Sequence, residues 1–186
     1  WGQGTLSTRK VTSSYWCLRS SIIPFILKFR MSVQQLTDRN QIIDAVNAIG
    51  IYADTHAWDK LKSVFADEVL LDYTSLAGEP HKLAPDVFIS AWKGLLPGFK
   101  MTQHQITNHV VTLRENDADC FSYVTAVHHL PVDQGENYWT IHGFYDHHLV
   151  RSSNGWKVDA MKFTARFQQG NLNLSKLAAE VAAKKQ

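Results

Sequence analysis

The second half of the chain contains four long segments rich in β-branched and aromatic residues, and these segments most constrain the fold. They cover residues 102–114, 119–130, 138–151 and 155–167. Short polar separators lie between them, and the last one contains Asn154-Gly155, a pair typical of tight hairpin turns. Consecutive strands joined by short turns form an antiparallel meander. The sequence therefore predicts one sheet over most of this region.

Three helical stretches precede these strands. Thr37 and Asp38 predict the start of the first, because their side chains can cap free backbone N–H groups and apolar residues follow at helical spacing. A short second helix is expected over 58–65, and a third starts near Pro85, since proline suits a first helical turn. Helices followed by antiparallel strands predict an α+β fold whose helices cover one face of a curved sheet. An alanine-rich helix, 175–185, is expected to end the chain as a tail.

The first thirty residues differ from the rest in composition. They are rich in Ser and Thr and lack hydrophobic periodicity. We interpret Met31 as the natural start and expect 1–30 to be a disordered or non-native extension. The apolar run Ile22–Leu27 is too short to span a membrane, and no small-residue cleavage site follows it as in a signal peptide. The expected domain covers 31–172, with a helical tail over 173–186.

The charge of the chain argues against nucleic acid as a partner. The extension holds five of the 19 Lys and Arg residues and no Asp or Glu, so the remainder has 14 basic and 17 acidic residues and a formal charge of −3. No basic patch is left, and neither nucleic-acid nor membrane binding is expected. Cys17 and Cys120 form no disulfide framework or metal motif. This cysteine usage fits a reducing compartment, and we expect a cytoplasmic protein.

Asp54 and His104 are the most informative polar residues. Asp54 lies in a predicted helical stretch, and His104 opens a predicted strand fifty residues later. A carboxylate that accepts the N–H of one imidazole nitrogen raises the basicity of the other nitrogen. Such a pair can remove a proton from carbon or oxygen near neutral pH. Spacing alone does not bring the two residues together, so the fold must do so.

Several motifs occur in an order that resembles the SnoaL-like group of the nuclear transport factor 2-like superfamily. They are Asp54-x3-Trp58-x2-Leu61-x3-Phe65, His104-x3-Asn108, Gly143-x-Tyr145-Asp146, Asn154-Gly155-Trp156 and Phe167-x2-Gly170-Asn171. The resemblance covers residues 36–172. It implies a cone-shaped, strongly curved antiparallel sheet wrapped by the N-terminal helices, as in cystatin-like α+β barrels, around a deep apolar pocket. The superfamily contains enzymes and proteins without catalysis, so the fold alone does not decide the function.

Within this group the chain is similar to hexachlorocyclohexane dehydrochlorinase and scytalone dehydratase, which use a pocket histidine as a base beside an aspartate. The resemblance places Asp54 and His104 at these two positions. It implies a cofactor-independent lyase or isomerase, dehydratase- or dehydrohalogenase-like, with a small apolar or cyclic organic substrate. The alternative is a non-catalytic ligand-binding or scaffold protein that keeps the pair for structure. Because the family commonly pairs two cones through the open sheet face, a homodimer is expected.

Five further residues are candidate substrate-binding groups: Asn108, Tyr52, Tyr73, His142 and Arg166. Asn108 is expected to share a strand face with His104 and Val110, because strand side chains alternate with a period of two. Tyr52 and Tyr73 either reach the pocket through their hydroxyls or belong to the core. For His142 the sequence leaves open which face of its strand lines the pocket. Arg166 lies either at the mouth of the cone or on the surface.

The nine histidines do not predict a metal site. His128-His129 and His147-His148 are adjacent pairs, and adjacent residues of a strand point to opposite faces. No carboxylate stands at the spacing that a metal triad with His104 and His142 would need. The sequence also lacks a glycine-rich nucleotide loop and zinc-ligand spacing. We therefore expect neither a metal nor an organic cofactor.

Overall fold

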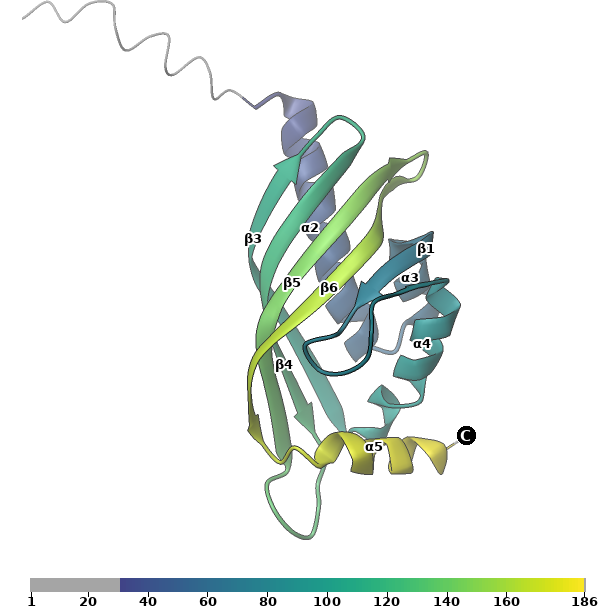
Figure 1. The fold of residues 1–186 in the computed structure, drawn as a ribbon, viewed down its shortest axis with the longest axis vertical. Helices are drawn as coiled ribbons and strands as arrows, with labels where there is room; N and C mark the ends of the chain where they lie inside the picture. The colour runs from purple at the N-terminus through teal and green to yellow at the C-terminus, as the bar shows by residue number, and fades with distance from the viewer. Residues whose placement is uncertain (1–30, 186) are drawn as a thin grey trace, which may run out of the picture. The chain divides into compact units, whose positions relative to one another are not determined.

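The computed structural model describes residues 31–185 of the 186-residue chain, and all elements given below lie from Val33 onward (Figure 1). The expected extension over residues 1–30 lies outside the described residues. The elements in chain order are α2 (Val33–Asp54), α3 (Trp58–Val64), β1 (Phe65–Asp72), β2 (His81–Leu83), α4 (Pro85–Lys93), the 3-10 helix η2 (Leu96–Gly98), β3 (Met101–Leu113), β4 (Asp117–His129), β5 (Tyr138–Ser152), β6 (Gly155–Gly170) and α5 (Leu174–Ala183). No helix among them is both long and apolar enough to cross a bilayer.

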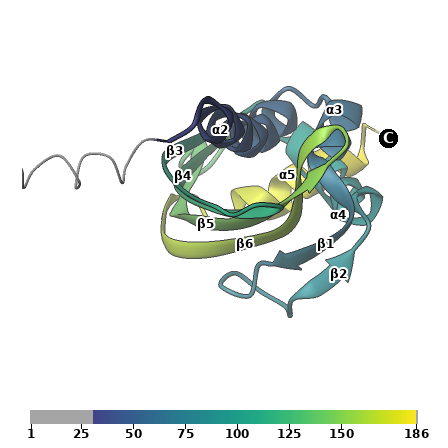
Figure 2. The ribbon, with the colours of Figure 1, turned by 90° about the horizontal axis from the view of Figure 1, so that it is seen from above.

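The strands form one six-stranded sheet in the order β2-β1-β6-β5-β4-β3. The four long strands pair as the predicted antiparallel meander, whereas β1 joins the edge of β6 in parallel. Figure 2 shows the sheet curving around an interior, with α2 lying across its open side. The predicted α+β class with a curved sheet and helices on one face is confirmed.

The alternation of buried and exposed residues on β5 settles which face lines the interior. Ile141, Tyr145 and His147 are buried, whereas His142 and Asp146 lie on the opposite, outer face. Because side chains alternate along a strand, all odd-numbered residues in this part of β5 face the helices. On this part of β5, the polar side chains that can line the interior are therefore those of the odd-numbered residues.

A β-bulge changes the facing of residues along β3. The pairing with β4 shifts register between Thr107 and Val110, and Asn108 has a φ of 58°, in the left-handed region. An extra residue in one strand inverts the alternation beyond it. His104 faces the interior before the bulge and Val111 faces it afterwards, while Asn108 and Val110 are exposed. The prediction that Asn108 and Val110 share a face with His104 is therefore wrong.

Helix α2 starts earlier than predicted, at Val33, so Asp38 lies inside it rather than capping it. The Asp38 carboxylate is buried and accepts two hydrogen bonds from the guanidinium of Arg151, at 2.8 and 2.9 Å. The indole N–H of Trp156 donates a third, at 3.2 Å. Asp38, which the sequence predicted as a helix cap, therefore links α2 to the β5–β6 hairpin.

The C-terminal helix predicted as a tail packs against the body through one side. Leu174 and Ala178 of α5 are fully buried with Phe99 and Leu130. A Cβ at Gly98 would lie 1.8 Å from the carbonyl oxygen of Ala178, so only glycine permits this approach. Helix α5 therefore packs against η2, and η2 contributes Leu96 to the wall of the cavity described next.

Candidate active site

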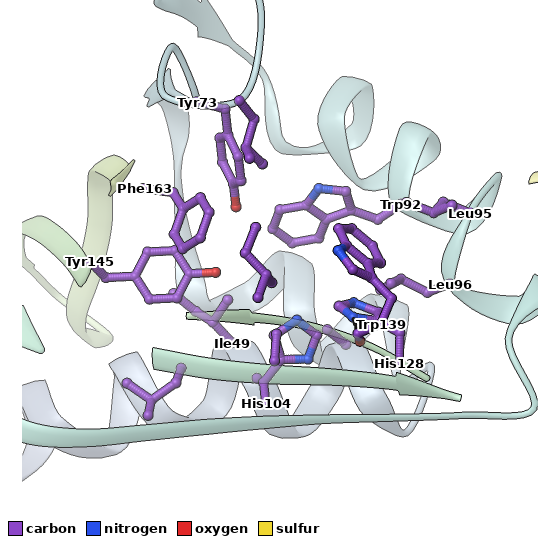
Figure 3. Close-up of a pocket in the computed structure, with 16 residues that line it drawn as sticks. Ile49, Tyr73, Trp92, Leu95, Leu96, His104, His128, Trp139, Tyr145 and Phe163 are labelled. Atoms are coloured by element: carbon purple, nitrogen blue, oxygen red, sulfur yellow. Dashed lines mark hydrogen bonds between the residues drawn. The ribbon is translucent and has the colours of Figure 1, made fainter. Parts of the chain in front are cut away.

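A cavity of about 260 Å³ lies between the concave face of the sheet and the helices (Figure 3). Its walls are mainly apolar and aromatic. The lining residues are Ile49, Gly50, Ala53, Tyr73, Leu76, Trp92, Leu95, Leu96, His104, Ile106, Ala126, His128, Trp139, Ile141, Tyr145 and Phe163. This volume lies just below the usual range of about 300–1,000 Å³ for small-molecule sites, so the space suits a compact ring compound.

His104 and Asp54 are hydrogen-bonded at one side of this cavity. The Nδ1 atom of His104 lies 2.7 Å from Oδ1 of Asp54, and both side chains are mostly buried. An ionised carboxylate only accepts hydrogen bonds, so Nδ1 carries the proton of the neutral ring and Nε2 carries the lone pair. Figure 3 shows the His104 ring rising from its strand into the cavity. Nε2 is therefore the nitrogen available to a bound molecule.

Three hydrogen bonds fix the Asp54 carboxylate. Besides the His104 ring, Oδ1 accepts the hydroxyl of Thr102 at 2.7 Å, and Oδ2 accepts the backbone N–H of His104 at 2.7 Å. Burial alone would raise the pKa of Asp54, but the hydrogen bonds and the charge of His104 outweigh it and lower that pKa below its ordinary value. Asp54 is thus ionised at neutral pH. Thr102, two residues before His104 on the same strand face, was missed from the sequence although the period of two points to it.

Gly50 brings the helix close enough for this pair to form. A Cβ at Gly50 would lie 3.0 Å from Cβ of His104 and 3.3 Å from Cδ1 of Ile106. Asp54 follows Gly50 by four residues, so the two lie on the same face of α2, one turn apart. The close approach of helix and strand at Gly50 therefore sets the reach of Asp54 to His104.

A second histidine, His128, lines the cavity beside His104. Their ring centroids are 5.7 Å apart and perpendicular, and His128 also stacks on Trp139 at 4.4 Å. Burial, followed by the charge of His104, lowers the pKa of His128 to about 4, so this ring is neutral. Its Nδ1 lies 3.3 Å from the carbonyl oxygen of Trp139 and donates to it, which leaves Nε2 as an acceptor. From the sequence, His128 was only one of several strand histidines and tyrosines that could hydrogen-bond a substrate oxygen.

Two tyrosines provide the hydroxyl groups of the cavity. The hydroxyls of Tyr73 and Tyr145 both point into the interior in Figure 3, and the two phenols interact electrostatically with each other. Burial raises the pKa of Tyr145 to about 12 and that of Tyr73 well above its ordinary value, so both remain protonated. A protonated phenol can donate its hydrogen to a ligand oxygen.

The structure places four of the predicted substrate-binding residues away from the cavity. Asn108 is exposed at the bulge, and Tyr52, near the end of α2, packs against the core without lining the cavity. His142 lies on the outer sheet face, stacked on Phe167 with ring centroids 4.3 Å apart. Arg166 lies on the same outer face, over an aromatic ring. Of the five candidates, only Tyr73 reaches the cavity.

The cavity carries little fixed charge. None of its sixteen lining residues is Lys, Arg, Asp or Glu. The only ionisable groups among them are two imidazoles and two phenols. Across residues 31–185, no three His, Cys, Asp or Glu side chains are grouped so as to hold a metal ion. The lining therefore suits an uncharged molecule with one or two oxygen substituents.

Comparison with known proteins agrees with this architecture. The profile of the SnoaL-like domain matches residues 34–162. The chain belongs to the SnoaL-like family. The resemblance inferred from the sequence motifs is thereby confirmed. No curated protein matches the chain.

Solved structures of similar fold extend the comparison of this SnoaL-like protein. The Kfla4162 protein from Kribbella flavida is 30% identical, over 79% of this chain and 97% of that one, with a TM-score of 0.69. A scytalone dehydratase-like protein from Novosphingobium aromaticivorans is 16% identical over 76% and 92%, with a TM-score of 0.66. The type 3 hexachlorocyclohexane dehydrochlorinase from Novosphingobium barchaimii is 16% identical over 74% and 92%, with a TM-score of 0.63. At these lower identities, the last two show the shared fold.

Proposed function

We propose that this SnoaL-like protein is a cofactor-independent lyase or isomerase that removes a proton from carbon in a small, uncharged cyclic compound. The observation that carries the proposal is the Asp54–His104 hydrogen bond beside a mainly apolar cavity. Fold neighbours that include a dehydratase-like protein and a dehydrochlorinase support it. Proton abstraction by an imidazole needs a positioned base, and the chain's own residues supply one.

In the proposed reaction, Nε2 of His104 takes a proton from a carbon next to the one that bears the leaving group. The released electron pair forms the carbon–carbon double bond, and the bond to the leaving hydroxyl or halide breaks with its electrons. In the isomerase variant, the imidazolium returns the proton to a different carbon. Asp54 stabilises the positive charge on His104 while the ring holds the proton.

Two further groups would orient the substrate. The hydroxyl of Tyr73 or of Tyr145 would donate to a carbonyl or leaving-group oxygen. Nε2 of His128 would accept from a substrate hydroxyl. Because the polar donors are phenols and the lining lacks a cation, we favour hydroxyl over halide as leaving group. The aromatic walls would hold a ring by stacking.

The alternative is a non-catalytic protein of the same fold that binds an apolar ligand. The mainly apolar and aromatic lining of the cavity favours this second candidate, because such walls bind a ring without any chemistry. The two candidates differ in one respect that can be measured, namely whether His104 is needed for a change in the ligand or only for the shape of its site.

A panel of cyclic alcohols, ketones and halides should be screened for elimination and isomerisation. Once a substrate is found, His104→Ala should lower kcat by about a hundredfold to ten-thousandfold, the usual contribution of a general base. Circular dichroism would verify its fold. His142→Ala is the matched control, since His142 lies on the outer sheet face. A folded His104→Ala protein with wild-type rates would contradict the mechanism.

We also propose a cytoplasmic homodimer that pairs through the outer sheet face. Support comes from apolar side chains exposed on that face, including Val110 at 60%, Phe167 at 53% and Tyr123 at 48%. Cys120, the one cysteine within residues 31–185, is a buried thiol, and such a thiol fits a reducing compartment. Light scattering should give twice the chain mass for the wild type and a smaller mass for Tyr123→Asp. A wild-type monomer at micromolar concentration would remove the dimer.

A further inference from the structure

We propose that the loop between β1 and β2, residues 73–80, is the gate of the cavity, with Leu76 as its closing side chain and Ser75 as its latch. Among the sixteen lining residues, only Leu76 is largely open to solvent, with 43% of its surface exposed. A leucine with one side on a cavity and the other in water marks the mouth of that cavity. This proposal concerns entry of a ligand, so it does not depend on whether the ligand is turned over.

Ser75 ties the loop to the neighbouring strand. Its hydroxyl donates to the carbonyl oxygen of Phe163 at 2.8 Å and accepts the N–H of Ala165 at 2.9 Å. Backbone pairing between β1 and β6 ends at Asp72, opposite Lys162, so the serine hydroxyl continues the link where the backbone ladder stops. Figure 1 shows this loop next to β6. Two side-chain hydrogen bonds can break without unfolding the sheet.

Hydrogen bonds within the loop would let it move as a rigid unit. Asp72 accepts the backbone N–H of Thr74 at 3.0 Å and its hydroxyl at 2.7 Å. The N–H of Leu76 closes the turn with a 2.8 Å bond to the carbonyl three residues earlier. Further on, Gly78 has a φ of +82°, and nothing lies within 4 Å of a Cβ built there. A closed turn beside an unpacked glycine can pivot once the Ser75 bonds break.

The closed gate also positions the polar contacts of the cavity. Tyr73 is the first residue of the loop, and its hydroxyl points into the interior beside that of Tyr145 (Figure 3). The latch acceptor, Phe163, belongs to the cavity wall through its ring. Opening the loop therefore widens the mouth and loosens the tyrosine pair together. Leu76 then sets the upper size limit of the ligand, and Ser75 sets how often the mouth opens.

The test measures binding of three uncharged phenols of increasing length: phenol, 2-naphthol and 4-phenylphenol. Stopped-flow tryptophan fluorescence is suitable because Trp92 and Trp139 line the cavity. Ser75→Ala should raise the association and dissociation rate constants of 2-naphthol together, each about fivefold to tenfold, with little change in Kd. Ser75→Thr, which keeps the hydroxyl, should restore wild-type rates. Leu76→Ala should bind 4-phenylphenol at least about tenfold more tightly, with phenol unchanged.

Two control variants separate the gate from general loosening. Ser63→Ala removes an exposed hydroxyl bonded within its own helix, and Leu172→Ala shortens an exposed leucine away from the cavity. Both should behave as wild type. Equal rates in Ser75→Ala and wild type, or an unchanged preference among the phenols in Leu76→Ala, would overturn the gate. So would a failure of all three phenols to bind both the wild type and Leu76→Ala. Missing turnover would count against the proposed function alone.

Discussion

Helix α2 carries two carboxylates, the buried Asp38 and the mostly buried Asp54, and the contrast between them separates a structural ion pair from a candidate catalytic one. Each has a lowered pKa, and each is bonded to a basic side chain from the sheet. Asp38 meets Arg151, whose hydrogen bonds lower the pKa of this carboxyl to about 2. Asp54 meets His104. The carboxylates are alike, and their partners differ in whether they can release a proton.

An arginine stays charged at any pH at which the protein is folded, so the Asp38–Arg151 pair can stabilise the fold but cannot exchange a proton. Its guanidinium also stacks on the ring of Trp156, 4.4 Å from the centroid. Histidine exchanges its proton near neutral pH, and His104 reaches a cavity. The comparison indicates that the partner and the space beside it, rather than the carboxylate, distinguish a structural ion pair from a catalytic candidate.

The largest effect is expected where the exchangeable pair is broken. Asp54→Asn keeps the size of the side chain and removes the charge that stabilises the His104 imidazolium. We expect turnover to fall on the order of a hundredfold to ten-thousandfold, with the unfolding midpoint little changed. Steady-state kinetics and urea unfolding of the same preparation measure both quantities. Full activity in Asp54→Asn would show that the two pairs do not differ as proposed.

Breaking the fixed pair should have the opposite profile. Asp38→Asn removes the charge that compensates Arg151 inside the fold, and loss of one partner of a buried ion pair typically costs about 3 kcal/mol or more. Since the Arg151 side chain is 34% exposed, water can compensate in part, and we expect roughly 2–3 kcal/mol. Urea unfolding measures this loss. Rates per folded molecule at low temperature should stay near wild type, and a selective loss of turnover would contradict the division of roles.

The sequence predicted the fold well where one physical signal dominated. Long β-branched segments with polar separators gave the four-strand meander, and Asn154-Gly155 gave its last hairpin. Local signals failed where tertiary contacts overrode them. Asp38 has the chemistry of a helix cap, but a partner more than a hundred residues away holds it inside the helix. Asn108 follows His104 by an even number of residues. The bulge between Thr107 and Val110, however, reverses which face of β3 the later side chains occupy.

The candidate site was predictable in part for similar reasons. The pairing of Asp54 with His104 was anticipated from the family motif, and its catalytic role stays a prediction. Tyr145 and His128 were not singled out, because both faces of their strands carry aromatic or histidine residues and the pattern cannot rank the faces. Only the packed helices decide that Tyr145 lies inside and His142 outside. Gly50 gave no signal either, since its importance lies in a contact with another element.

A smaller effect is expected from changing the distance between the helix and the strand. In Gly50→Ala the new methyl group would lie 3.0 Å from Cβ of His104, so α2 must shift by a few tenths of an ångström. Alanine favours the helix by about 1 kcal/mol, which offsets the steric cost in overall stability. We expect about tenfold slower turnover, because catalysis depends steeply on such positioning. Kinetics together with thermal unfolding would separate the two effects, and unchanged kcat would remove Gly50 from the positioning argument.

The smallest effect concerns pH and comes from His128, the cavity histidine that lacks a carboxylate partner. Burial holds the pKa of His128 at about 4 in the folded protein, against an ordinary value of 6.5 in the unfolded chain. Below pH 6.5 His128 is therefore protonated in the unfolded chain but stays neutral in the folded protein. The free energy of unfolding consequently falls as the pH drops from 6.5 toward 4. Carboxylates with lowered pKa values act only below about 3.8, outside this window. Near pH 6 the expected slope from His128 is roughly 1 kcal/mol per pH unit. Urea unfolding at several pH values between 7.5 and 5.5 should show that His128→Gln lowers the slope by this amount, while the neighbouring His129→Gln does not. An equal slope in the wild type and His128→Gln would mean that this ring is not held neutral by its burial.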